Sequence, residues 1–176
     1  ADLHHLPFEE QSFDFVYSIG VLHHLPDPET AFRNLLRFLK PGGQVHIYLY
    51  WQPEGQPIKR ALLAAASAIR RITTHIPHRL LYGLSYPAAV AAFASFVWPY
   101  QLLSAAGLNQ IAERLPMKQY AQYPFRVCVN YQFDRFSAPI EYRYTRQEVL
   151  GWMERADLDE ITIRPNFGWC ATGRKK

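Results

Sequence analysis

The chain has 176 residues, of which 49% are hydrophobic and 19% are charged, and its formal net charge is +4. This composition places it among globular proteins that bury a substantial core. The basic residues are scattered in ones and twos, so we expect solvated helix faces and no nucleic-acid-binding patch. Cys128 and Cys170 lie too far apart to indicate a disulfide framework or zinc spacing, which favours a reducing compartment.

Residues 1–51 are predicted to form a compact α/β unit. The apolar run Phe13–Ile19 lacks clean alternation, which is typical of a central parallel strand buried on both faces. Asp27 and Pro28 then have the side-chain types of an N-cap and a first helical position. Pro41-Gly42-Gly43 is predicted to end this helix, and Val45–Trp51 to form the next strand. Strand, helix and strand in this order predict a parallel βαβ crossover.

Residues 52–115 are predicted to be a helical insert or cap. Ile58–Ile72 is expected to form one helix, and the rest of the segment to be broken at Pro and Gly positions: Pro77, Gly83, Pro87, Pro99 and Gly107. No charged side chain occurs between Leu80 and Ala112. Three interpretations of residues 80–112 remain open: a transmembrane span interrupted by prolines, an interfacial hairpin on anionic lipid, or a cap over an active-site mouth. We favour the cap.

Residues 116–176 are predicted to return to the α/β core. Residues 116–144 are rich in aromatic side chains and are expected to be irregular or short-stranded. Thr145 and Glu148 have the spacing of a capping box, which predicts a helix that buries Val149 and Trp152. Two closing strands, Leu158–Arg164 and Phe167–Thr172, are expected after that helix.

Three motifs carry a resemblance to a known family. They are Asp2 to Phe8 (DLHHLPF), Ser12 to Asp27 (SFDFVYSIGVLHHLPD) and Phe38 to Gly43 (FLKPGG). Together they resemble the middle of a class I S-adenosylmethionine-dependent methyltransferase. The resemblance implies the α/β class, with a partial Rossmann-like sheet from its fourth strand onward and a helical insert.

The resemblance also implies what the chain lacks. In the family, a glycine-rich turn and an acidic ribose contact come before the segment matched here. The chain is therefore expected to be a carboxy-terminal part that binds the cofactor weakly by itself. Its first strand, Phe13–Ile19, is expected to be an exposed, apolar sheet edge.

The resemblance assigns roles to individual residues. Asp2 and Leu3 would bind the adenine edge, the first through its carboxylate and the second through its backbone amide. Ser18, Ile19 and Gly20 would face the methionine part of the cofactor. His23 is the candidate catalytic base. The substrate-binding candidates are His24, Tyr131 and Asp134, and Tyr142 is a weaker one. Adjacent histidines on an extended segment point to opposite sides, so we predict no metal site.

The sequence thus predicts an S-adenosyl-L-methionine-dependent methyltransferase that acts on a small, apolar or lipid-like acceptor. We expect such an enzyme to be cytoplasmic and to contact a membrane peripherally through residues 80–112. The alternative is a non-catalytic α/β domain whose helical insert binds a membrane or a partner protein. A nucleotide-binding oxidoreductase is a third, weaker interpretation. The sequence sets neither the acceptor nor the oligomeric state.

Overall fold

The computed structural model describes residues 6–115 and 117–176, which form two compact units. The sheet unit consists of the chain up to Leu63 together with Ile140–Lys176, and the helical unit is Ala64–Pro139. The chain was expected to rejoin the sheet at residue 116. In the structure residues 117–139 lie in the helical unit, and the return to the sheet begins at Ile140.

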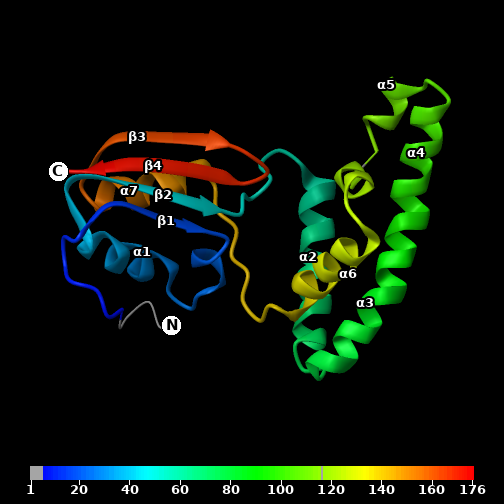
Figure 1. The fold of residues 1–176 in the computed structure, drawn as a ribbon, viewed down its shortest axis with the longest axis horizontal. Helices are drawn as coiled ribbons and strands as arrows, with labels where there is room; N and C mark the ends of the chain where they lie inside the picture. Colours follow the sequence, from blue (N-terminus) through cyan, green and yellow to red (C-terminus); the bar gives the residue numbers. More distant parts are fainter. Residues whose placement is uncertain (1–5, 116) are drawn as a thin grey trace. The chain divides into compact units, whose positions relative to one another are not determined.

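The sheet unit is built on four strands in the order β1-β2-β4-β3 (Figure 1). Its strands are β1 (Phe13–Ile19), β2 (Leu39–Leu49), β3 (Leu158–Pro165) and β4 (Trp169–Lys175). β1 and β2 are parallel, whereas β4 is antiparallel to both of its neighbours. The helix α1 (Pro28–Arg37) connects the parallel pair. The predicted α/β class and its parallel crossover are therefore confirmed.

The start of α1 follows the predicted capping pattern. The Asp27 side chain accepts a hydrogen bond from the Thr30 backbone amide at 3.2 Å, and Pro28 occupies the first turn. The Pro-Gly-Gly motif differs from expectation, because it lies inside β2. Phe13 pairs with Leu39 and Phe15 pairs with Gln44, so the motif forms a bulge in the β1–β2 ladder.

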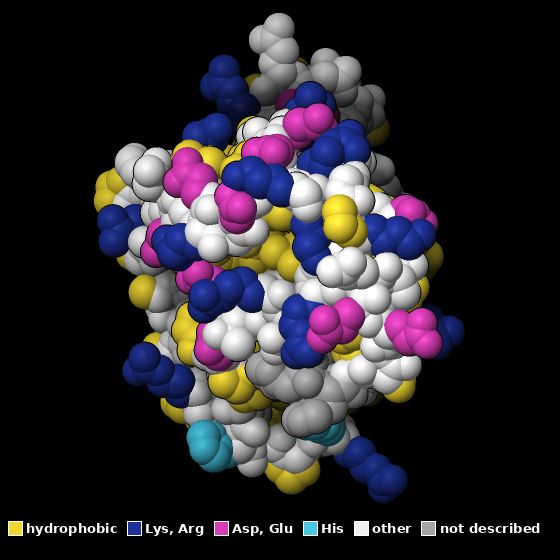
Figure 2. Space-filling view, turned by 90° about the vertical axis from the view of Figure 1, so that its left-hand side faces the viewer, with side chains coloured by type: hydrophobic (Ala, Val, Ile, Leu, Met, Phe, Trp, Pro, Cys, Tyr) yellow, Lys and Arg dark blue, Asp and Glu magenta, His cyan; other side chains and the backbone are white. Residues whose placement is uncertain are grey.

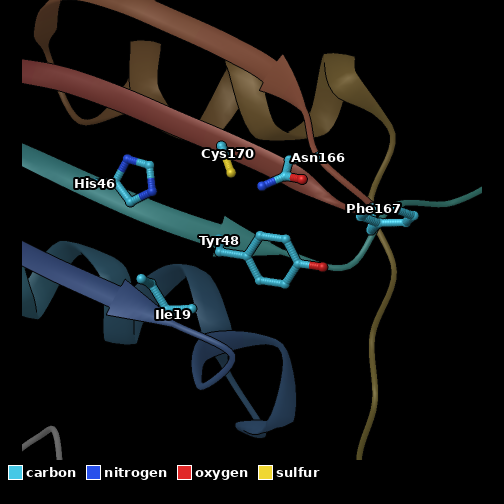
Figure 3. Close-up of a pocket in the computed structure, with 6 residues that line it drawn as sticks. All are labelled: Ile19, His46, Tyr48, Asn166, Phe167 and Cys170. Carbon is cyan, nitrogen blue, oxygen red and sulfur yellow. The ribbon is translucent and has the colours of Figure 1, made fainter. Parts of the chain in front are cut away.

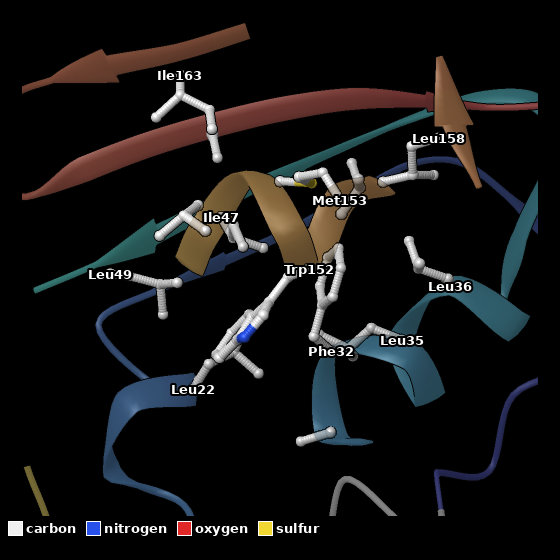
Figure 4. Close-up of a cluster of buried hydrophobic side chains, with 14 of the residues drawn as sticks. Leu22, Phe32, Leu35, Leu36, Ile47, Leu49, Trp152, Met153, Leu158 and Ile163 are labelled. Atoms are coloured by element: carbon white, nitrogen blue, oxygen red, sulfur yellow. The ribbon is translucent and has the colours of Figure 1, made fainter. Parts of the chain in front are cut away.

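A single hydrophobic core covers one face of this sheet (Figure 4). It joins β2 to α1 and to α7 (Arg146–Arg155), which begins with the predicted capping box of Thr145 and Glu148. Its largest buried side chains include Leu22, Phe32, Leu36, Ile47, Leu49, Trp152 and Met153. Both segments of the chain that form the sheet unit contribute side chains, so residues far apart in sequence share one core.

The opposite sheet face is open near β1. Among the side chains on β1, Phe15, Tyr17 and Ile19 are 53%, 66% and 58% exposed. The expectation that β1 is buried on both faces is wrong, while the expectation of an exposed apolar edge is confirmed. β1 pairs with β2 along one side only, among the residues that the structure describes.

The helical unit contains longer helices than the sequence predicts. Its elements are most of α2 (Pro57–Thr73), α3 (His78–Ala92), the π-turn η2 (Phe93–Val97), α4 (Trp98–Ala105), α5 (Asn109–Ala112), the 3₁₀ turn η3 (Lys118–Gln122) and α6 (Phe125–Ser137). The predicted helix over Ile58–Ile72 is confirmed by α2. The predicted breaks at Gly83, Pro87 and Pro99 are wrong, because His78–Ala105 is one helical run.

Local structure explains why the prolines do not stop this run. A proline ring clashes with the carbonyl four residues earlier and removes one hydrogen bond. Pro87 lies inside α3, which continues as a helix on both sides of it. Pro99 lies in the first turn of α4, immediately after the π-turn, where the helical register is already widened.

The aromatic segment after residue 116 is also more helical than predicted. Phe125–Ser137 forms α6, so the expectation of irregular or short-stranded chain is wrong there. Cys128 and Val129 on α6 pack with Ala89 and Ala92 on α3 in a second small core. The small side chains of α3 allow this close packing, and Phe93, Met117 and Ala121 pack against its outer parts.

Candidate cofactor and acceptor site

The carboxyl end of β1 holds the three residues predicted to face the cofactor's methionine part. Ser18 is buried, Ile19 is exposed on the open face, and Gly20 turns the chain with φ +74°. A side-chain carbon built at Gly20 meets nothing within 4 Å, so its backbone is open to close approach by a ligand. These features fit a cofactor-binding turn. Asp2 and Leu3 lie outside the described residues.

A shallow cavity of about 340 Å³ lies on the open sheet face beside this turn (Figure 3). Its lining residues come from β1, β2 and the β3–β4 hairpin: Ile19, His46, Tyr48, Asn166, Phe167 and Cys170. His46 Nδ1 lies 3.0 Å from the hydroxyl of Thr172, which orients the imidazole. The cavity therefore combines an apolar wall at Ile19 with polar groups on β2 and β4.

His23 and His24 lie on a 3₁₀ turn, Leu22–His24, and not on an extended segment. Their ring centroids are only 4.4 Å apart, so the prediction that the two rings point to opposite sides is wrong. The tight turn brings the side chains together because successive residues of a 3₁₀ helix are not related by a half rotation. Among the described residues, no group of three or more His, Cys, Asp and Glu side chains is placed to hold a metal ion.

His23 is fully buried. Its ring packs against that of Tyr50 with a centroid distance of 3.9 Å, and neither ring nitrogen has a hydrogen-bond partner of normal geometry. Burial, together with the positive charges that His24 and Arg143 can carry, lowers the pKa of His23 from 6.5 to about 4. His23 is thus a neutral side chain at pH 7. Its predicted role as catalytic base stays a prediction, and an acceptor would reach it only after the turn moves.

The buried His23 makes folding sensitive to acid. Between pH 6.5 and 4 the unfolded chain takes up a proton that the folded chain does not, so stability falls as the pH is lowered. The expected loss is roughly 3 kcal/mol. We expect His23→Phe to remove this loss and to keep or raise stability at neutral pH, because the aromatic ring is retained without unpaired nitrogens.

Urea unfolding at about pH 7 and about pH 4.5 measures this effect. The control is His75→Phe, which makes the same substitution at an exposed histidine. An acid sensitivity in His23→Phe equal to that of the unmodified chain would contradict the assignment.

His24 is the more accessible of the two histidines. Its Nδ1 donates a hydrogen bond to the carbonyl oxygen of Ile140 at 2.6 Å, and the ring is only partly buried. Because a carbonyl only accepts, the proton lies on Nδ1 and Nε2 is the acceptor nitrogen. The bond also ties the β1 end of the unit to the segment that returns from the helical unit, which suits a residue that shapes an acceptor pocket.

Sequence reasoning missed the residues that surround the two histidines. The Tyr50 ring packs against that of His23, and the Arg143 guanidinium lies over the Tyr50 ring at 5.3 Å from its centroid. Arg143 is also paired with Glu141. The alternation of His46 and Tyr48 on β2 with Tyr50 just after it was the available signal, because alternate residues of an extended chain share a face. Tyr142, a weaker candidate, donates its backbone amide to the His23 carbonyl at 2.9 Å.

The remaining substrate candidates lie in the other unit. Tyr131 and Asp134 are exposed residues of α6, whereas a loop was predicted for them. The Tyr131 ring is 5.3 Å from that of Tyr120. The structure therefore brings together Ser18, Ile19, Gly20, His23 and His24, and it does not place Tyr131 or Asp134 with them. Their assignment stays a prediction.

Comparisons with known proteins agree with the motifs. The family model described as "Methyltransferase domain" matches residues 1–47. Phosphoethanolamine N-methyltransferase 2 of Caenorhabditis elegans is 43% identical over 49 residues, which are 28% of this chain and 11% of that protein. Demethylmenaquinone methyltransferase of Streptomyces griseus is 32% identical over 124 residues, which are 62% of this chain and 48% of that protein.

A solved Thermotoga maritima S-adenosylmethionine-dependent methyltransferase covers 100% of this chain with a TM-score of 0.49 and 14% identity, and the match covers 62% of that protein. The chain spans less than half the length of the two curated relatives. The matched segment 1–47 contains the Gly20 turn, the histidine turn and the parallel β1–β2 pair. Residues 1–47, which contain the Gly20 turn and the histidine turn, are therefore similar to the methyltransferase-domain family.

Proposed function

We propose that this chain is part of an enzyme that moves a methyl group from S-adenosyl-L-methionine to a small, apolar or lipid-like acceptor. The observation that carries the proposal is the open Gly20 turn at the carboxyl end of β1. Ligands of open α/β sheets bind at this end of the strands. The segment that matches the methyltransferase-domain family contains this turn. The non-catalytic alternative finds no comparable support.

The proposed roles follow from the chemistry of methyl transfer. The cofactor supplies a methyl group already activated on a sulfonium, so the protein mainly orients the acceptor and excludes water. In the proposal, the backbone at Ser18 and Gly20 holds the methionine part. The carboxylate of Asp2 accepts from the adenine amine, and the amide of Leu3 donates to a ring nitrogen.

A base is needed only when the acceptor does not ionise readily. His23 is the base that the family resemblance indicates, but it is buried, whereas His24 has an acceptor nitrogen on a partly exposed ring. We therefore assign acceptor contact to His24 first. This assignment requires that His24→Ala lowers the rate of methyl transfer and leaves the affinity for the cofactor unchanged.

The acceptor class rests on the helical unit. The uncharged stretch 80–112 offers apolar side chains for an acceptor or a lipid surface. The helical run His78–Ala105 is long and apolar enough to span a membrane, by length and composition alone. The Streptomyces relative is named for an acceptor of the quinone class. We propose a cytoplasmic enzyme with peripheral membrane contact through residues 80–112, and no nucleic-acid substrate.

Isothermal titration of the full-length protein with S-adenosylhomocysteine tests cofactor use. We expect binding, and we expect Asp2→Ala to weaken it by about tenfold or more, since a charge-assisted hydrogen bond is lost. The control is Glu54→Ala, which removes an exposed carboxylate from the loop before α2. Unchanged binding in Asp2→Ala would refute the adenine assignment, and no binding by the unmodified protein would refute the proposed function.

A further inference from the structure

An apolar stripe runs along α2 without a protein partner among the described residues. Its large side chains are Ile58, Leu62, Ile69 and Ile72, which recur at the spacing of one helical face. They are 77%, 66%, 50% and 71% exposed. Apolar residues at this spacing normally face a core, so their exposure along the whole helix indicates a surface that is covered by something else.

Two hydrogen bonds attach the carboxyl end of α2 to α6. The buried Arg70 donates from Nε to the carbonyl oxygen of Arg135 at 2.9 Å. Thr73 donates its hydroxyl to the carbonyl oxygen of Phe136 at 2.7 Å. Both bonds go to the last turn of α6. Arg70 makes its bond from a different side of the helix than the stripe, and Thr73 adds a bond at the last residue of α2. The exposed isoleucine and leucine side chains take no part in this attachment.

The charges on and around α2 have one sign. The helix has four basic residues and no acidic one, and Arg60 and Arg71 are exposed. Residues 64–139 contain seven Lys and Arg against two Asp and Glu. The sheet unit is different, because its face in Figure 2 mixes both signs, and pairs such as Lys40–Asp14 and Arg174–Glu160 lie in that unit. The excess of positive charge therefore belongs to the helical unit.

We propose that α2 is an amphipathic anchor that lies on an anionic lipid surface. This inference rests on the proposed function, because it takes the membrane contact from it. It deepens that function by assigning the principal contact with the membrane to α2 in place of residues 80–112. The apolar stripe would enter the boundary between headgroups and acyl chains, and Arg60 and Arg71 would remain among the headgroups. Each basic residue near an anionic surface adds to the attraction, and the helix has no acidic residue to oppose it.

The rest of the helical unit is consistent with a lipid neighbour. Only 22% of the most apolar window of His78–Ala105 is buried. A helix that is apolar on all sides normally lies in a core or in lipid. Trp98, at the start of α4, is 53% exposed, and tryptophan is a side chain enriched at membrane interfaces.

Vesicle co-sedimentation of the full-length protein tests the anchor. We expect binding to vesicles of phosphatidylcholine mixed with phosphatidylglycerol and much weaker binding to phosphatidylcholine alone. Replacing Leu62 and Ile69 together with glutamine should weaken binding by about tenfold or more, since two apolar side chains no longer enter the lipid. Both positions are exposed and glutamine is a good helix former, so folding is retained.

Two sets of matched variants isolate the contribution of α2. Phe167→Gln removes an 89% exposed apolar side chain from the β3–β4 turn and should leave binding unchanged. Replacing Arg60 and Arg71 with glutamine should abolish the preference for phosphatidylglycerol, whereas the same change at Arg146 and Arg164 in the sheet unit should not.

Leu102→Gln in α4 separates the anchor from the broader membrane contact. If this variant loses binding while the Leu62/Ile69 variant retains it, the anchor is overturned and the contact through residues 80–112 survives. The anchor is also overturned if both variants still bind vesicles as the unmodified protein does. It is overturned as well if the unmodified protein changes its oligomeric state and does not bind vesicles. Titration of the Leu62/Ile69 and Leu102 variants with S-adenosylhomocysteine should give unchanged affinity, so a failed anchor and a failed cofactor site are distinguished.

Discussion

Gly20→Ala should weaken binding of S-adenosylhomocysteine to the full-length protein by at least about tenfold, while the protein remains folded. The added methyl group meets no protein atom within 4 Å, so it projects into the space that the proposed site leaves for the cofactor. The backbone at Gly20 has φ +74°, which costs an alanine about 1–2 kcal/mol. That cost lowers stability, but it does not by itself abolish binding.

Gly55→Ala is the matched control for this prediction. Gly55 has φ +68°, and a side-chain carbon built on it also meets nothing within 4 Å. It lies in the loop before α2, away from the carboxyl end of β1 in the chain. The two variants should therefore lose similar stability in thermal unfolding, and only Gly20→Ala should lose cofactor binding. Equal loss of binding would show that the effect is general backbone strain and would remove Gly20 from the site.

The elements that were predicted correctly have local signals in the sequence. Asp27 and Pro28 indicate a helix start, Thr145 and Glu148 indicate another, and both starts are present in the structure. The run Phe13–Ile19 indicates β1 because apolar and aromatic residues dominate it. These signals need only the nearest residues along the chain, so tertiary contacts do not overturn them.

The errors have a common physical cause in the packing of the helical unit. Gly83, Pro87 and Pro99 disfavour helix locally, yet packing of α3 against α6 stabilises the helical run and a π-turn accommodates Pro99. The aromatic residues of α6 are good strand formers, but Cys128 and Gln132 are buried four residues apart, which is a helical spacing, and Cys128 and Val129 pack in the core shared with α3. Tertiary packing therefore outweighs single-residue propensity in both helices.

The candidate site was predictable in its parts and not in its arrangement. The family motifs identified the Gly20 turn and the two histidines, because those residues are close together in sequence. The burial of His23 against Tyr50 and the bond from His24 to Ile140 required the segment that returns from the helical unit. No local pattern links residues 116 positions apart, which is the separation of His24 and Ile140.

Trp152→Ala should destabilise the sheet unit by about 3–5 kcal/mol, the range for removing a large aromatic side chain from a core. Trp152 is 5% exposed and stacks on Phe32 of α1 with a centroid distance of 6.2 Å, and it contacts Tyr144 edge-on at 4.7 Å. It thereby joins the returning segment to the β1–α1–β2 crossover. Trp98→Ala, at an exposed position of α4, should cost under about 1 kcal/mol. Urea unfolding followed by far-ultraviolet circular dichroism compares the two variants.

Because the crossover contains the Gly20 turn, loss of the Trp152 contact should also lower cofactor affinity by lowering the folded fraction. If both tryptophan variants lost the same stability, the core that joins the two ends of the sheet unit would not be its main source of stability.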